Sequence, residues 1–270
     1  MKYLYTNGCS FVYGDELQNP NDGNWQFDHR WSKILSAKMG VEEINQAQNG
    51  SSNNRIYRTT KDWVLSNKSK LKDTFVVLGW SQAIRTERFN DMAGIYEAIN
   101  FGIDPDNMCA SENNGMDATG QTIQGKAHGP FLGQSPSRKF WHEYNKYYLN
   151  ESWFTEESAL RVFGMQELLN KLNVKYYFYF SMETMVLHYL QQSKNKKLYD
   201  FKKIYKLSQE EWITNEVKKQ TGGILEWDSK VNTFKNSKGG WSGFNGSHPD
   251  EKSHELWADF LYKQYKRLYK

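Results

Sequence analysis

With 270 residues, the chain is long enough to bury a full hydrophobic core, and we expect a single domain that spans residues 1–270. Its 35 basic and 31 acidic residues leave a net charge of +4, too small an excess to indicate nucleic acid as a partner, and no apolar stretch is long enough to predict a membrane partner. The sequence opens on a short strand pattern in place of a secretory signal, which predicts a cytoplasmic protein.

Strand and helix patterns alternate through the first eighty residues. The predicted elements are a strand over residues 2–5, a helix over 31–39, a strand over 41–47, a helix over about 53–70 and a strand over 74–80. Gly40 after the first helix is a usual C-terminal cap, and serine and asparagine residues stand at the start of the second helix, where they can cap it. The last strand is apolar, which is typical of a strand buried in a parallel sheet.

The pattern changes between about residues 88 and 150. The stretch from Asn107 to Ser137 is rich in glycine, asparagine, serine and glutamine, so we predict an inserted polar segment that forms an excursion or a lid. The regular elements that follow are a helix over about 152–172, a strand over 174–181, a lysine-rich helical stretch over 185–220, a short strand over 224–227 and a helix over 251–268. Strands separated by helices predict a flavodoxin-like, doubly wound parallel sheet in a three-layer α/β/α fold.

Three turns of small residues follow three of the predicted strands. These turns are Gly8-Cys9-Ser10, Asn49-Gly50-Ser51 and Gly79-Trp80-Ser81. The carboxyl ends of parallel strands meet at the crevice where open α/β sheets bind ligands, so we expect the turns to share one rim. Ser10 is the candidate nucleophile, and His248, near the other end of the chain, is the candidate base. The backbone amides of Ser10 and Gly50 and the side chain of Ser81 are the candidate donors to an oxyanion.

The order and spacing of these blocks resemble the SGNH, or GDSL-like, hydrolases. The matching blocks are Gly8-Cys9-Ser10, Gly50, Gly79-Trp80-Ser81-Gln82 and Asn245-Gly246-Ser247-His248-Pro249. Arg85-Thr86-Glu87 after the third block is similar to the phage-encoded branch of that family. The resemblance implies a serine esterase, with no cofactor, that hydrolyses a small acyl ester such as an O-acetyl group on a carbohydrate. A phage-encoded protein of this kind is expected in the host cytoplasm or in the virion.

The third block departs from the family pattern. Ser81 stands where the family has an asparagine that donates to the oxyanion, and Asn53 or Asn54 could substitute for that donor. We predict that Asn53, Trp80 and Arg85 contact the substrate. Arg85 could also form a surface ion pair with Glu87 in place of shaping the pocket.

The fifth block departs as well. Asn245 stands where the family has the aspartate that holds His248, and an amide oxygen can orient an imidazole without adding a charge. Asp228 or Asp250 could supply the acid, or the site could work as a Ser–His dyad. The substituted blocks also permit the alternative of a catalytically silent protein that retains the fold, such as a phage accessory or virion component that binds glycans.

Other polar residues have simpler interpretations. The two cysteines, Cys9 and Cys109, have no metal-ligand spacing and no disulfide framework, and we predict that both are buried in the core. The histidines show no ligand spacing either, so the sequence indicates no metal site. His254 in the last predicted helix is interpreted as a packing or surface residue.

Overall fold

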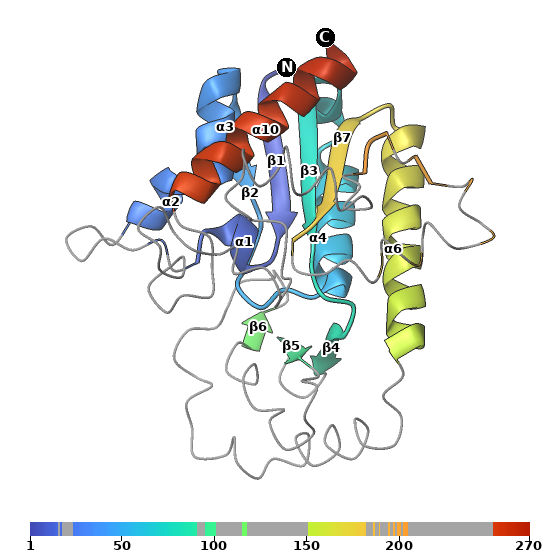
Figure 1. Ribbon diagram of the computed structural model, residues 1–270. Coiled ribbons are helices and arrows are strands. Elements are labelled where there is room, and N and C mark those ends of the chain that lie inside the picture. The colour runs from blue at the N-terminus through green and yellow to red at the C-terminus, as the bar shows by residue number, and fades with distance from the viewer. Residues whose placement is uncertain are drawn as a thin grey trace.

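A parallel sheet with helices on both of its faces forms the centre of the protein (Figure 1). The computed structural model describes residues 1–15, 17, 24–90, 95–100, 115–117, 151–181, 186, 189, 194, 197, 199–200, 202–204 and 251–270. The four strands of this sheet are β2 (Glu42–Asn45), β1 (Tyr3–Gly8), β3 (Thr74–Trp80) and β7 (Lys175–Phe180), in that spatial order. Every pair is parallel, and β1 is an interior strand, so the predicted α/β fold is confirmed.

The helices agree closely with the sequence patterns. They are α1 (Ser10–Tyr13), α2 (Trp25–His29), α3 (Trp31–Met39), α4 (Asn53–Ser66), the 3-10 helix η1 (Lys68–Asp73), α6 (Glu151–Lys171) and α10 (Glu251–Tyr269). Gly40 caps α3 in the left-handed conformation, with a φ of 65°. The Ser52 hydroxyl caps α4 by accepting from the Arg55 N–H at 3.2 Å. The one long helix predicted over 53–70 is therefore two helices, which join at Asn67.

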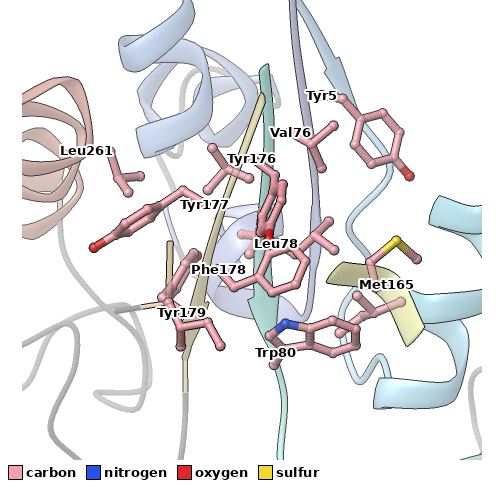
Figure 2. Close-up of a cluster of buried hydrophobic side chains, with 14 of the residues drawn as sticks. Tyr5, Val76, Leu78, Trp80, Met165, Tyr176, Tyr177, Phe178, Tyr179 and Leu261 are labelled. Carbon is pink, nitrogen blue, oxygen red and sulfur yellow. The ribbon is translucent and has the colours of Figure 1, made fainter. Parts of the chain in front are cut away.

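Side chains of β7 alternate between the two helical layers, as a strand buried on both faces requires. Figure 2 shows Tyr177 and Tyr179 on the side of Leu261 in α10, and Met165 of α6 on the opposite side. Phe178 also points away from α10, and its ring packs edge-on against Trp80 with centroids 5.6 Å apart. The many aromatic residues of the strands are thus largely core residues.

A second, smaller sheet lies beyond the carboxyl end of β3 (Figure 1). Its strands are β4 (Arg85–Asn90), β5 (Ile95–Asn100) and β6 (Gly115–Asp117), which pair antiparallel in that order. β5, β6 and the last residues of β4 fall inside the predicted polar insertion. The rest of that insertion, Cys109, the predicted strand over 224–227 and most of the predicted helical stretch over 185–220 lie outside the described residues. None of the described helices is long and apolar enough to cross a membrane.

Gly8, the last residue of β1, lies where α1 folds back onto the strand. A Cβ atom at this position would stand 2.2 Å from Val12 Cγ2 and 2.8 Å from the Gly79 carbonyl oxygen. Both distances are far below van der Waals contact, and the second neighbour is backbone that cannot rotate away. Glycine is required here because α1 packs directly on the strand end, and this packing sets the position of Ser10.

Substitution of Gly8 with alanine is therefore expected to lower the free energy of unfolding by about 3 kcal/mol, the upper part of the range for overpacked cores. Gly40→Ala is the matched control, since its Cβ would meet nothing within 4 Å and only the left-handed backbone is strained, at a cost of about 1 kcal/mol. Urea unfolding of both variants measures the difference. Equal losses would show that close approach of α1 is not the reason for Gly8.

Candidate functional site

The three predicted turns lie next to one another at one rim of the parallel sheet. Gly8 and Gly79 are direct partners in the β1–β3 pairing, so the first and third turns leave the sheet side by side. The Gln48 N–H donates to the Gly8 carbonyl oxygen at 3.2 Å and connects the second turn to the first. The prediction that the ends of β1, β2 and β3 share a rim is confirmed.

Ser10 is the first residue of α1 and is almost fully buried, with 2% of its surface exposed. No hydrogen bond joins its hydroxyl to another side chain in the described part of the chain, which leaves the oxygen uncommitted there. The neighbouring Cys9 is fully buried, with its Sγ 3.2 Å from the Ser181 hydroxyl, which itself donates to the Trp80 carbonyl oxygen. The prediction that Cys9 is a core residue is confirmed.

The second turn is held by a buried arginine that sequence reasoning missed. Arg55 of α4 donates from Nη1 to the Gln46 carbonyl oxygen at 3.0 Å and to the Ser51 hydroxyl at 3.2 Å. Burial lowers the pKa of Arg55 to about 10, so the side chain still carries its charge at neutral pH. Gly50 lies inside this turn in the left-handed conformation, with a φ of 73°. At the outer end, the Asn49 amide donates to Asp15 at 2.5 Å.

The third turn is held by Asn53, at the start of α4. Its Oδ1 accepts from the Ser81 N–H at 2.7 Å, and its Nδ2 donates to the Ser81 carbonyl oxygen at 3.0 Å and to the Ser158 hydroxyl at 3.1 Å. Ser81 is fully buried, and Arg85 Nη1 donates to its Oγ at 3.4 Å. Asn53 thus uses both ends of its amide to hold Ser81, and its contact with a substrate stays a prediction.

Loss of this clamp is expected to destabilise the fold. Asn53→Ala removes the partner of the Ser81 N–H and one partner of the Ser81 carbonyl, and we expect a loss of about 3 kcal/mol because these groups are buried. Asn54→Ala is the control, since Asn54 is partly exposed and, among the described residues, its amide donates to the Thr86 hydroxyl alone, at a cost of about 1 kcal/mol. Chemical denaturation of both variants measures the contrast. A loss at Asn53 no larger than that at Asn54 would contradict the clamp.

The remaining predicted substrate contacts lie beside the third turn. Trp80 is fully buried in the core, and its contact with a substrate stays a prediction. Arg85 contacts Ser81 as described, but Glu87 pairs with Arg58, in a bidentate pair of 2.8 and 3.0 Å. The alternative of an Arg85–Glu87 ion pair is therefore not among the ion pairs of the described residues, and Arg85 is directed to the third turn.

The two candidate histidines have different outcomes. His254 is fully buried in α10, and its Nδ1 accepts the N–H of Trp31 at the start of α3, at 3.0 Å, so its structural interpretation is confirmed. His248 and Asn245 lie outside the described residues, as do the alternative acids Asp228 and Asp250. The base and its orienting group therefore remain predictions.

A buried polar layer beneath the rim was also missed. The Asn7 amide accepts from the Gly8 N–H at 2.9 Å and donates to the Thr59 and Thr60 hydroxyls at 2.8 and 3.0 Å. The available signal was an amide directly after the strand pattern at the start of the chain, because a polar side chain that is buried there needs partners. Among the described residues, no group of three histidine, cysteine or acidic side chains is arranged to hold a metal ion.

Comparison of the sequence with known families gives one partial match. The model of a family of unknown function (DUF6071) matches residues 13–117, which is less than half of the chain. The matched region begins after Ser10 and includes Gly50 and Ser81. No curated protein matches the sequence.

Several solved structures are similar to this chain at low sequence identity. One is a protein assigned to the G-D-S-L lipolytic family from Desulfitobacterium hafniense, with 10% identity, a TM-score of 0.43, and coverage of 98% of this chain and 99% of that chain. Another is a psychrotrophic esterase from Pseudoalteromonas sp., with 11% identity, a TM-score of 0.44, and coverage of 99% and 98%. A third is an acetyl xylan esterase from the rumen bacterium Butyrivibrio proteoclasticus, with 9% identity, a TM-score of 0.49, and coverage of 98% and 64%.

Proposed function

We propose that the protein is a serine esterase of the SGNH type, with Ser10 as its nucleophile. The observation that carries the proposal is the position of Ser10 at the carboxyl end of an interior strand, beside the second and third turns of the rim. Ligands bind in this crevice of open α/β sheets, and a serine at a strand-to-helix turn is well placed to meet them. The left-handed turn at Gly50 and the clamped turn at Ser81 flank it.

In the proposed reaction, Ser10 Oγ attacks the ester carbonyl carbon while His248 takes the hydroxyl proton. The negative charge on the carbonyl oxygen is stabilised by the N–H groups of Ser10 and Gly50 and by the Ser81 hydroxyl. The tetrahedral intermediate collapses with release of the alcohol, which takes its proton from His248. Water then attacks the acyl-serine by the same route, and the acid leaves with Ser10 restored.

The departures from the family pattern at Ser81 and Asn245 determine how fast the proposed esterase is expected to be. Serine reaches less far than asparagine, so Ser81 donates to the oxyanion only if its backbone is held in place, which the Asn53 clamp supports. An amide at Asn245 can orient His248 but adds no charge to stabilise the imidazolium. A slow esterase is therefore expected, in comparison with enzymes that hold a full triad.

The proposed substrate is a small acyl ester, including O-acetyl groups on carbohydrates, and the proposed location is the cytoplasm. The phage-encoded branch, with the host cytoplasm or the virion as its location, is a proposal that rests on Gly79-Trp80-Ser81 followed by Arg85-Thr86-Glu87. The rival function is a silent glycan-binding protein. The departures at Ser81 and Asn245 favour this rival. The first replaces an asparagine that donates to the oxyanion, and the second replaces the aspartate that holds the base.

Covalent capture of the serine tests the proposal against this rival. The wild type is incubated with p-nitrophenyl acetate to measure turnover, and separately with a fluorophosphonate that reacts with activated serines. We expect p-nitrophenol release and a single adduct mapped to Ser10 by peptide mass spectrometry. An intact, folded protein that shows neither turnover nor an adduct would support the silent binding protein.

A further inference from the structure

A groove on the flank of the domain has no role in the chemistry described above. It lies between α4 and α6, which run side by side (Figure 1). Residues of β4 and β5 line it as well. Its volume is about 480 Å³, which is within the usual range for small-molecule sites. We call it the α4–α6 groove. Its uncharged lining residues are Asn54, Tyr57, Tyr96 and Leu160, and its charged ones are Arg58, Lys61, Glu87, Glu157 and Arg161.

The charges in the groove are already compensated. Arg58 forms its bidentate pair with Glu87, whose side chain is only 5% exposed, and Arg161 pairs with Glu157 at 2.8 Å. The third cation of the lining, Lys61, pairs with Asp62 at 3.5 Å. An anionic ligand would have to displace or approach these carboxylates, and a cationic ligand would meet the two guanidinium groups. Both are disfavoured, because a charge that leaves water without a partner costs free energy. The groove therefore fits a neutral ligand.

The same residues favour a ligand with many hydroxyl groups. When guanidinium and carboxylate groups are held in pairs, their N–H donors and oxygen lone pairs point in fixed directions. Neighbouring hydroxyl groups of a ligand can form hydrogen bonds with these donors and acceptors. Tyr57 and Tyr96 add aromatic rings, and Arg58 lies 3.7 Å from the centre of the Tyr96 ring, which fixes both side chains. Leu160 adds apolar surface, with 55% of the residue exposed. Polar edges beside aromatic faces suit the alternating hydroxyl and C–H faces of a sugar ring.

The groove is connected to the candidate site through the start of α4. Asn54 lines it, and the preceding residue, Asn53, holds Ser81 at the third turn. The Asn54 amide donates to the Thr86 hydroxyl at 3.0 Å, so the end of the groove is joined to the start of β4. A chain of several sugar units in the groove can thus continue toward the rim that carries Ser10.

We propose that the α4–α6 groove is a subsite for a neutral oligosaccharide. The inference rests on the proposed function, because the groove would hold the carbohydrate whose ester group Ser10 attacks. It names the substrate as a neutral, extended glycan and assigns its recognition to Tyr57, Tyr96 and Leu160 together with the paired arginines.

Direct binding, measured without turnover, tests the inference. Xylohexaose, cellohexaose and chitohexaose are titrated by calorimetry into the Ser10→Ala variant, with a heparin-derived hexasaccharide as the anionic comparison. Tyr57→Ala removes a ring from the groove, and Leu160→Arg places a charge in it from an exposed position that tolerates substitution. Tyr262→Ala is the control, because Tyr262 is a partly buried tyrosine in α10 with Lys266 over its ring.

We expect at least one neutral hexasaccharide to bind, and both groove variants to weaken its affinity about tenfold, while Tyr262→Ala changes it less than twofold. The inference is overturned if no neutral hexasaccharide binds at millimolar concentration, if neither groove variant weakens binding, or if the heparin fragment binds more tightly. Circular dichroism of each variant separates lost binding from lost folding. Hydrolysis of p-nitrophenyl acetate by the wild type tests the esterase separately, so either proposal can fail while the other stands.

Discussion

Ester hydrolysis by the Ser10→Ala variant is expected to fall by roughly 10⁴-fold or more relative to the wild type, as for the nucleophile of other serine hydrolases. This factor corresponds to about 5.5 kcal/mol of transition-state stabilisation. The loss arises because no acyl-enzyme can form without Oγ, whereas the donors of the rim remain in place. The measurement is the initial rate with p-nitrophenyl acetate, corrected for hydrolysis in buffer.

Cys9→Ala is the matched control for this experiment. Cys9 precedes Ser10 in the same turn, but its thiol faces Ser181 in the core, so its loss should change the rate by less than tenfold. The fold of Ser10→Ala should persist, because no hydrogen bond from the hydroxyl to another described side chain is lost. If Ser10→Ala retains the activity and Cys9→Ala loses it, the nucleophile is the thiol and the proposed mechanism is wrong.

The two histidines near α10 are expected to separate activity from stability. His248→Ala should lower the rate of ester hydrolysis by roughly 10⁴-fold or more, because the nucleophile loses its base, and should leave the free energy of unfolding nearly unchanged. His254→Ala should do the reverse and cost about 3 kcal/mol of stability, since it leaves the buried Trp31 N–H without that acceptor and opens a cavity. The folded fraction of His254→Ala should still hydrolyse the ester.

Parallel rate measurements and urea unfolding of both variants check this separation. His254→Gln is a useful third variant, because its amide can accept the Trp31 N–H in part and should recover some stability. Activity of His248→Ala within tenfold of the wild type would show that another group takes the serine proton.

Local patterns predicted the elements of the fold well. The limits of α3 and β3 match the expectation to the residue, because Gly40 marks the end of the helix and the apolar run marks the strand. The break at Asn67 was not foreseen, since the helical periodicity continues through it. The strands β4, β5 and β6 were also missed, because none of the three sequences shows a strict alternation of apolar and polar residues.

The site was predicted in part, for a topological reason. Parallel strands bring their carboxyl ends together, so three turns far apart in the sequence could be placed at one rim before any coordinates. The contacts that hold the turns could not be placed in this way. Asn53 and Ser81 are 28 positions apart, and Trp31 and His254 are 223 apart. Such pairs depend on the packing of whole helices, which no local pattern of residues specifies.

The hydrogen bonds that join α10 to α3 and to β7 have a consequence for synthesis of the protein. His254 accepts a hydrogen bond from Trp31, and the Tyr269 hydroxyl both receives the Tyr176 N–H at 3.0 Å and donates to its carbonyl oxygen at 2.7 Å. A nascent chain that has emerged from the ribosome only to residue 250 therefore exposes the aromatic face of β7 and an uncapped α3. Long-range closure of this kind slows folding, and chaperones have their longest opportunity to bind before α10 has been synthesised.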